Sequence, residues 1–171
     1  MFAKLKQRWQ DMRTIADLSK DAERRALQAG QQHPGAEHYA LAALDLADGS
    51  ARRVFQRIGA DPEAYRAALA NRHAAALSAM GLDAAGAVGA GEAPAAAVAG
   101  KLFDAQPSGQ ALMQTLPEVQ RRLPAPLCGA HILLAVAGMR LSAAGRALGA
   151  INVDPQVLGR AAEEELRAML A

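Results

Sequence analysis

The sequence predicts an all-α protein made of two related four-helix units, and three observations support this prediction. Apolar residues make up 51% of the 171-residue chain but aromatic residues only 4%, so the core must be built mainly from Ala, Leu, Val, Ile and Met. These residues favour helices that pack closely. Helix start and stop signals recur in one order in both halves of the chain. Two apolar segments, at 36–44 and 129–137, are also alike in sequence.

The two halves keep one register over their whole length. His38 and His131 are 93 positions apart, and each stands two residues after the start of its apolar segment. The Asp-Pro pairs that follow, Asp61-Pro62 and Asp154-Pro155, are separated by the same 93 positions without a gap. Apolar positions between these landmarks also coincide, which is the signature of an internal repeat.

The first unit is predicted to span residues 12–80 and to contain four helices. Apolar residues at helical spacing indicate a first helix that ends near Gly30. A second, mostly apolar helix over 36–47 is expected at the centre of the fold. Ser50 is the predicted cap of a short third helix. Asp61 suits the cap of the fourth helix, with Pro62 in its first turn, and this helix is expected to end near residue 80.

The second unit, residues 107–171, repeats this plan. Its first helix is expected over 107–123, with a kink or break at Pro117 because proline lacks the amide hydrogen that a helix interior needs. A central helix over 129–138 follows. Ser142 is expected to cap the short helix, and Asp154 with Pro155 starts a last helix that ends near residue 170.

The remaining segments are an N-terminal extension, residues 1–11, and an Ala/Gly-rich linker, residues 81–106. The linker has little periodicity and is expected to be flexible or only partly helical within one compact domain. The extension is locally basic, which is typical of a solvated helix start.

Charge and cysteine content exclude several classes of protein. The 19 basic and 17 acidic side chains nearly balance, so no nucleic-acid partner is expected. Cys128 is the single cysteine, which rules out an internal disulfide and fits a reducing compartment. Because neither a secretory leader nor an apolar run long enough for a bilayer is evident, we expect a soluble cytoplasmic protein with no membrane partner.

The repeat resembles the N-terminal domain of Clp-type protein unfoldases. The residues that carry this resemblance are the small–acid–His–apolar segment beginning Ala36-Glu37-His38 and the later Gly59-x-Asp61-Pro62 sequence. The second half has related segments that keep His131 and the Asp154-Pro155 pair. The resemblance implies two four-helix repeats related by a pseudo-twofold axis. It also implies a domain that receives substrates and adaptors ahead of ATPase modules. No phosphate-binding loop is present in this sequence, so we expect a stand-alone relative without the ATPase.

The histidine pair has two possible roles. His38 and His131 start equivalent helices and could act as ligands or bases. The favoured interpretation is structural, with each imidazole bonded to a backbone carbonyl of its own repeat. No cluster has metal-ligand spacing and no serine has a nucleophile frame. We therefore predict no enzyme activity, cofactor or metal.

Glu37 is the first candidate binding residue. In relatives from Gram-positive bacteria, the acid at this place in each repeat helps to hold phosphoarginine, a degradation tag, and a carboxylate suits its guanidinium. In this chain Ala130 occupies the second place, and Met12 stands where a polar residue is expected near the first site. The resemblance therefore implies a site that is at most half retained. The alternative is that Glu37 only complements the helix dipole.

The N-terminal extension offers a second candidate surface. Phe2, Leu5 and Trp9 precede the repeat, and a tryptophan in that position could anchor a partner. The alternative is that the extension folds back onto the domain.

Three functions are compatible with these observations. The first is a non-enzymatic module that binds substrates, adaptors or degradation tags and modulates a separate Clp unfoldase. The second is a decoy that sequesters small cyclic peptides directed at Clp proteins. The third is a helical scaffold with an unrelated partner, since a fold does not dictate function.

Overall fold

The computed structural model describes residues 2–81 and 105–171, and within these ranges every regular element is a helix. The first repeat contains α1 (Phe2–Gln28), α2 (Ala36–Leu44), α3 (Ser50–Arg57) and α4 (Pro62–Ala79). The second contains α5 (Pro107–Arg122), α6 (Gly129–Ala137), α7 (Ala143–Ala150) and α8 (Pro155–Leu170). The predicted all-α fold with eight helices is confirmed for the described part of the chain.

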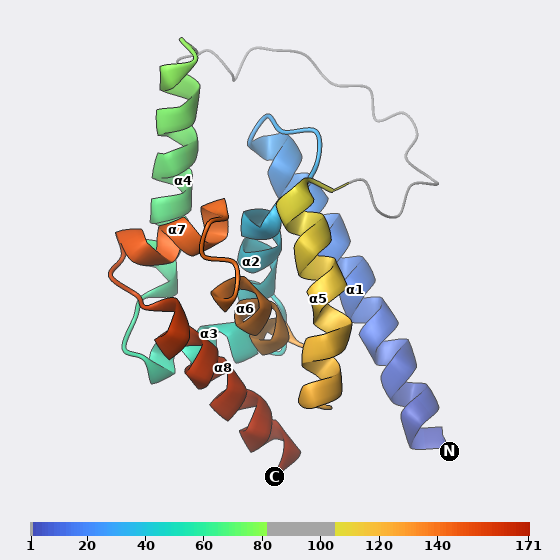
Figure 1. Cartoon of the computed structure of the whole chain (residues 1–171). Helices are drawn as coiled ribbons and strands as arrows, with labels where there is room; N and C mark the ends of the chain where they lie inside the picture. Colours follow the sequence, from blue (N-terminus) through green and yellow to red (C-terminus); the bar gives the residue numbers. More distant parts are fainter. Residues whose placement is uncertain (1, 82–104) are drawn as a thin grey trace.

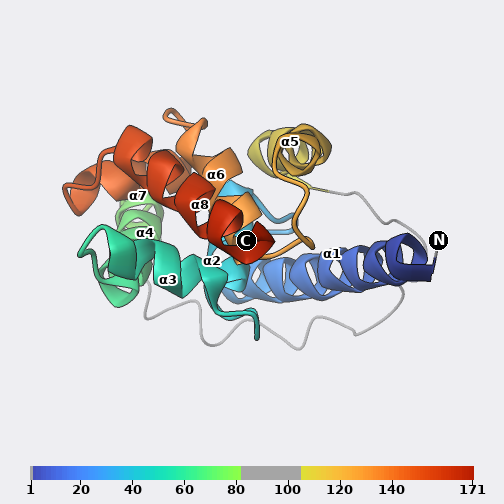
Figure 2. The ribbon, with the colours of Figure 1, turned by 90° about the horizontal axis from the view of Figure 1, so that it is seen from below.

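The two repeats share one core because helices of each repeat pack against helices of the other. The central helices α2 and α6 pack against each other, as Figures 1 and 2 show. The third helix of each repeat then packs on the fourth helix of the other, α3 on α8 and α4 on α7. Tyr65 of α4 is fully buried, and its hydroxyl donates a hydrogen bond to the carbonyl of Ala144 in α7 at 3.1 Å. Neither repeat could therefore bury its apolar face alone.

Each central helix is capped by a side chain from the opposite repeat. At the start of α2, the amide of Ala36 donates to the Ser108 hydroxyl at 3.1 Å. At the start of α6, the amide of Ala130 donates to the Ser50 hydroxyl at 2.9 Å. These bonds satisfy amides that no carbonyl of the same helix can reach, so they tie the two repeats together.

Most predicted helix caps are present. The side chain of Asp61 accepts a hydrogen bond from the amide of Glu63 at 2.9 Å, and that of Asp154 accepts one from the amide of Gln156 at 2.8 Å. Ser142 accepts one from the amide of Gly145 at 3.1 Å. The repeated Asp-Pro pairs therefore have the same structural role in both units.

Ser50 has a different role from the predicted one. The N-cap of α3 is Gly49, with φ 65°. The amide of Ser50 donates a hydrogen bond to the Asp48 carboxylate at 2.8 Å. A left-handed conformation favours glycine at that position. The Ser50 hydroxyl is consequently free to cap α6, a long-range contact that local sequence does not reveal.

Two other expectations about helix ends also need correction. A kink or a break was expected at Pro117; helix α5 continues through this residue, so there is no break. Pro117 is exposed while Leu112, Leu116 and Val119 are buried, so packing of the apolar face holds the helix together although the proline donates no amide hydrogen. Helix α2 ends at Leu44, three residues before the predicted end.

The N-terminal extension does not fold back onto the domain. Helix α1 runs without interruption from Phe2, and in Figure 2 its N-terminal end projects past the other helices. The predicted linker falls almost entirely on residues 82–104, outside the described residues. Among the described residues, no helix is both long and apolar enough to cross a bilayer.

The equivalent histidines make different contacts. The Nδ1 atom of His131 accepts a hydrogen bond from the Cys128 amide at 3.3 Å, and its Nε2 donates to the carbonyl of Leu123 at 3.0 Å. The Nδ1 atom of His38 accepts one from the Gly35 amide at 2.9 Å, without the carbonyl contact expected for both. His131 therefore joins α6 to the end of α5, whereas His38 only closes the first turn of α2.

Candidate ligand-binding cavity

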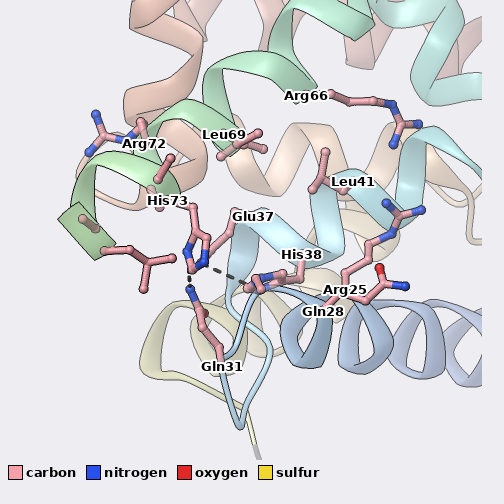
Figure 3. A pocket seen from close by; sticks show the side chains of 16 residues that line it. Arg25, Gln28, Gln31, Glu37, His38, Leu41, Arg66, Leu69, Arg72 and His73 are labelled. Carbon is pink, nitrogen blue, oxygen red and sulfur yellow. Dashed lines mark hydrogen bonds and ion pairs between the residues drawn. The ribbon is translucent and has the colours of Figure 1, made fainter. Parts of the chain in front are cut away.

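A cavity of about 580 Å³ opens between the end of α1, the start of α2 and the length of α4. Figure 3 shows side chains from all three helices around it. Leu41, Leu69 and Leu77 line its apolar wall together with several alanines. Glu37, His38, two glutamines and several basic side chains supply its polar groups. The cavity belongs to the first repeat except for one contact with Ala143 of α7.

The cavity exists because α4 stands off α2 where its counterpart α8 packs closely on α6. A side chain on Gly159 of α8 would place its Cβ 3.4 Å from that of Ala137 of α6. The equivalent positions in the first repeat, 93 residues earlier, are Arg66 and Leu44. Two larger side chains therefore replace the small pair that allows close helix packing.

Glu37 and His38 form one polar end of the cavity at the start of α2. The Glu37 carboxylate lies so close to Gly35 that a Cβ there would be only 2.6 Å from Oε2, so Gly35 leaves the room that the carboxylate occupies. Oε1 of Glu37 is 3.7 Å from Nδ1 of His38. Burial lowers the pKa of His38 below its usual value, although the charge of Glu37 partly opposes this shift. His38 is therefore neutral near pH 7, and Glu37 places a carboxylate at this end.

Basic side chains surround the other side of the cavity. Arg25 and Arg66 both form ion pairs with Asp45, which lies just after α2. Burial acts to raise the pKa of Asp45, but the hydrogen bond and charge of Arg66, together with Arg25, outweigh it and lower the pKa. Arg25 also pairs with Asp21, and Arg66 with Glu63, so both arginines already have carboxylate partners within the protein.

Arg72 and His73, on the outer half of α4, complete this polar lining. Arg72 is exposed and forms no ion pair with any described residue. His73 is half-buried, with Nδ1 3.5 Å from Nε2 of Gln31 (Figure 3). An incoming ligand would thus meet an acid at one end, apolar side chains along the wall and an available guanidinium at the edge.

The structure separates the residues proposed from the sequence. Of the candidate binding residues Glu37, Met12, Phe2 and Trp9, only Glu37 lines the cavity. Met12 is 13 residues before Arg25 on the same helix, which corresponds to roughly 20 Å along α1, and it is 66% exposed. Phe2 and Trp9 are still farther from the cavity and are also exposed. The candidate residues therefore define two surfaces, the cavity and the outer face of α1.

Ala130, the counterpart of Glu37, is fully buried. It lies at the start of α6 against α3, where its amide is bonded to Ser50. An acid at this position would be buried between the two repeats. This packing is a physical reason for the missing second acid.

Sequence reasoning missed the basic residues of the cavity. Arg66, Arg72 and His73 look like ordinary exposed residues of an amphipathic helix. A comparison of the two repeats could have identified them, because the second repeat has Gly159, Glu165 and Leu166 at the equivalent positions. A change from glycine, acid and leucine to two arginines and a histidine marks the face on which the copies diverge.

Two observations concern metal ligands and thiol chemistry in the described residues. None of them form a group of three or more His, Cys, Asp or Glu side chains that could hold a metal ion. The Cys128 thiol is buried, and burial raises its pKa, which opposes formation of a reactive thiolate.

Comparison with known proteins agrees with this fold. Residues 15–87 match the family model described as the Clp repeat (R) N-terminal domain, which confirms the resemblance identified from the sequence. The first repeat is therefore similar to the Clp repeat N-terminal domain. No curated protein matches the chain.

Proposed function

We propose that this protein is a non-enzymatic module of the Clp proteolysis system that binds protein or peptide segments in the cavity of its first repeat. Such a module would receive substrates, adaptors or degradation tags in the cytoplasm and modulate a separate Clp unfoldase. The main supporting observation is the cavity itself, which combines an apolar wall with Glu37 at one end.

The size and lining of the cavity favour one or two side chains of a peptide. Its volume of about 580 Å³ lies in the usual range of ligand sites. Leu41 and Leu69 would contact the apolar part of a residue. The Glu37 carboxylate would pair with a cationic head, and arginine satisfies both requirements, because its apolar stem carries a guanidinium.

Phosphoarginine is the most specific ligand of this kind. Its guanidinium would face Glu37, while its phosphate would need a cation. Arg72 is the arginine of the cavity without an ion pair among the described residues, and His73 adjoins it. The proposal therefore predicts one site in the first repeat and none at Ala130.

The test measures thermal stabilisation of the protein by short peptides containing phosphoarginine, arginine or alanine at one position. A ligand that binds only the folded state raises the melting temperature. We expect stabilisation by the phosphoarginine peptide, reduced stabilisation by the arginine peptide and none by the alanine peptide. Glu37→Gln should abolish the effect, whereas Glu118→Gln, an exposed acid of the second repeat, should retain it.

Co-purification from the native cell provides the link to the Clp system. The wild-type protein should recover a Clp component or a Clp substrate, and Glu37→Gln should recover less of it. Equal stabilisation by all three peptides, or unchanged binding by Glu37→Gln, would contradict the proposal. Stabilisation by Clp-directed cyclic peptides alone would favour the decoy function instead.

A further inference from the structure

The outer face of α1 presents an apolar stripe that the fold leaves uncovered. Phe2, Leu5, Trp9 and Met12 are exposed by 90%, 57%, 72% and 66%, respectively. Their spacing of three, four and three residues places them on one side of the helix. Trp9 lies nine residues before the buried Leu18, which at about 100° per residue puts it on the opposite side of the helix.

The inner face of the same helix segment is anchored to the domain. The carboxylate of Asp11 accepts hydrogen bonds from the amide of Leu127 at 2.8 Å and from Nε2 of Gln120 at 2.7 Å. These contacts to the second repeat fix the rotation of α1. The stripe is consequently held outward by the structure, with the domain body behind it.

The spacing of the stripe is that of a coiled-coil seam. If Phe2 is heptad position a, then Leu5 is d, Trp9 is a and Met12 is d. The stripe is only about 80° wide on a helical projection, narrower than the apolar face of at least 100° that a surface helix usually buries. A second helix fits such a narrow seam better than a flat bilayer surface does.

The e and g positions from residue 2 to residue 13 are all basic. In this register Lys6 and Arg13 occupy e positions, and Arg8 occupies a g position. All three are exposed, and none forms an ion pair with a described residue. Because e and g residues select the partner of a coiled coil, this pattern disfavours pairing with a second copy, which would bring like charges together in either orientation.

We infer that the outer face of α1 is a docking surface for an acidic amphipathic helix of another protein. The partner helix would supply apolar side chains at a and d and Asp or Glu at e and g. This inference rests on α1 alone and does not depend on the cavity, so a failure of one leaves the other intact.

The single tryptophan of the chain reports directly on this surface. The probe is a 21-residue peptide with Leu at every a and d position and Glu at every e and g position, which also hinders its pairing with itself. The control peptide has Lys in place of each Glu. Adding the Glu peptide to the full chain should shift the Trp9 emission to the blue with saturation, and the Lys peptide should not.

Charge reversal distinguishes recognition from nonspecific apolar contact. Lys6→Glu/Arg13→Glu should lose at least tenfold in affinity for the Glu peptide and gain affinity for the Lys peptide. Arg140→Glu/Arg160→Glu changes the net charge equally at exposed sites elsewhere and should leave both affinities unchanged. Met12→Ala should weaken Glu-peptide binding by about tenfold, the scale of one buried interface side chain. Circular dichroism should show unchanged helix content in each variant.

Several results would overturn this inference. They are the absence of a shift with either peptide, equal shifts with both, and a blue shift produced by phosphatidylserine vesicles but not by the Glu peptide. A dimeric mass in sedimentation equilibrium that Trp9→Ala abolishes would also overturn it, because the stripe would then be covered by a second copy.

Discussion

The fourth helices of the two repeats, α4 and α8, start from the same Asp-Pro cap yet meet their central helices differently. Helix α8 packs along α6 and buries Leu158, Glu165 and Leu166. Helix α4 buries Tyr65 at the position equivalent to Leu158 but then leaves α2, and its outer half projects from the body of the domain in Figure 1. One scaffold thus produces a closed interface in the second repeat and a cavity in the first.

The difference is decided by a few side chains rather than by the helices themselves. Gly159 and Ala137 let α8 approach α6, whereas Arg66 and Leu44 occupy the same places in the first repeat. Beyond that point the closed copy places Leu166 in the core, and the open copy places His73 in the cavity lining. A repeat can therefore keep its caps and core while exchanging one interface for a binding site.

The largest expected effect comes from truncating the two equivalent residues at this interface. Leu166→Ala should lower the free energy of unfolding by about 3 kcal/mol, since the residue is fully buried and leaves a cavity. His73→Ala should change it by less than about 0.5 kcal/mol, the usual range for a residue outside the core. Urea denaturation of both variants measures the difference.

A similar loss for the two variants would mean that α4 packs as closely as α8 in solution. A third variant, Leu69→Ala, provides the control, because Leu69 is 7% exposed at the point where α4 starts to leave the core. Its loss should fall between the other two.

The histidine pair gives the next largest effect. His131→Ala removes the partners of two buried backbone groups, at Cys128 and Leu123, and should cost about 2.5 kcal/mol. His38→Ala removes the partner of one, at Gly35, and should cost about 1.5 kcal/mol. His33→Ala serves as the control, with little loss expected. Equal losses for His38 and His131 would show that the carbonyl contact of His131 contributes nothing.

The same pair predicts a pH dependence. Burial lowers the pKa of both His38 and His131, so the unfolded chain binds more protons below its histidine pKa of about 6.5. Stability should therefore rise with pH up to that value and be lost progressively as the pH falls below it. The slope should be smaller in His131→Ala, and a slope identical to that of the wild type would contradict the assignment.

The sequence predicted what the two repeats share and missed where they differ. A constant offset of 93 residues is sufficient to locate the helices and the caps at Asp61 and Asp154, because these depend on local backbone chemistry. The role of Ser50 was not predictable in this way, because its partner amide lies 80 residues away in the other repeat. Likewise, Arg66 and His73 line a cavity only because α4 diverges from α2, a tertiary distance that helical periodicity does not encode.

An ion-pair cluster between the repeats, which has no equivalent in the other half of the fold, is expected to have a smaller effect on the free energy of unfolding. Glu165 of α8 accepts hydrogen bonds from Nε of Arg53 at 2.5 Å and from Nε of Arg57 at 2.9 Å. Its equivalent in the first repeat is Arg72. Glu165→Gln should cost about 1–2 kcal/mol, at the lower end for a buried pair because both arginines are partly exposed and can be solvated again.

Acid titration separates this pair from the histidines. Burial acts to raise the pKa of Glu165, but the hydrogen bonds and charges of Arg53 and Arg57 outweigh it and lower the pKa. The contribution of this pair is present above the unfolded glutamate pKa of about 4.3 and is lost as the pH falls through the lower folded value. Below about pH 4.3 the wild type should therefore lose stability faster than Glu165→Gln, and parallel curves would contradict the ion-pair assignment.

The smallest effect is expected at the N-caps of α4 and α8, where the two repeats should lose the same free energy of unfolding. This comparison tests whether the repeats differ only where α4 and α8 meet their central helices. Asp61 and Asp154 cap α4 and α8 through equivalent bonds of 2.9 and 2.8 Å, each followed by proline in the first turn. Replacing either by alanine should cost about 1 kcal/mol, the usual value of an N-cap, and replacement by serine should restore most of it. Since the two sites share no partner, the double variant should lose the sum of the two. A markedly smaller loss at Asp61 would mean that the whole of α4, and not only its outer half, is loosely attached to the domain. The cavity would then lie beside a mobile helix and would not be a fixed gap beside an anchored helix.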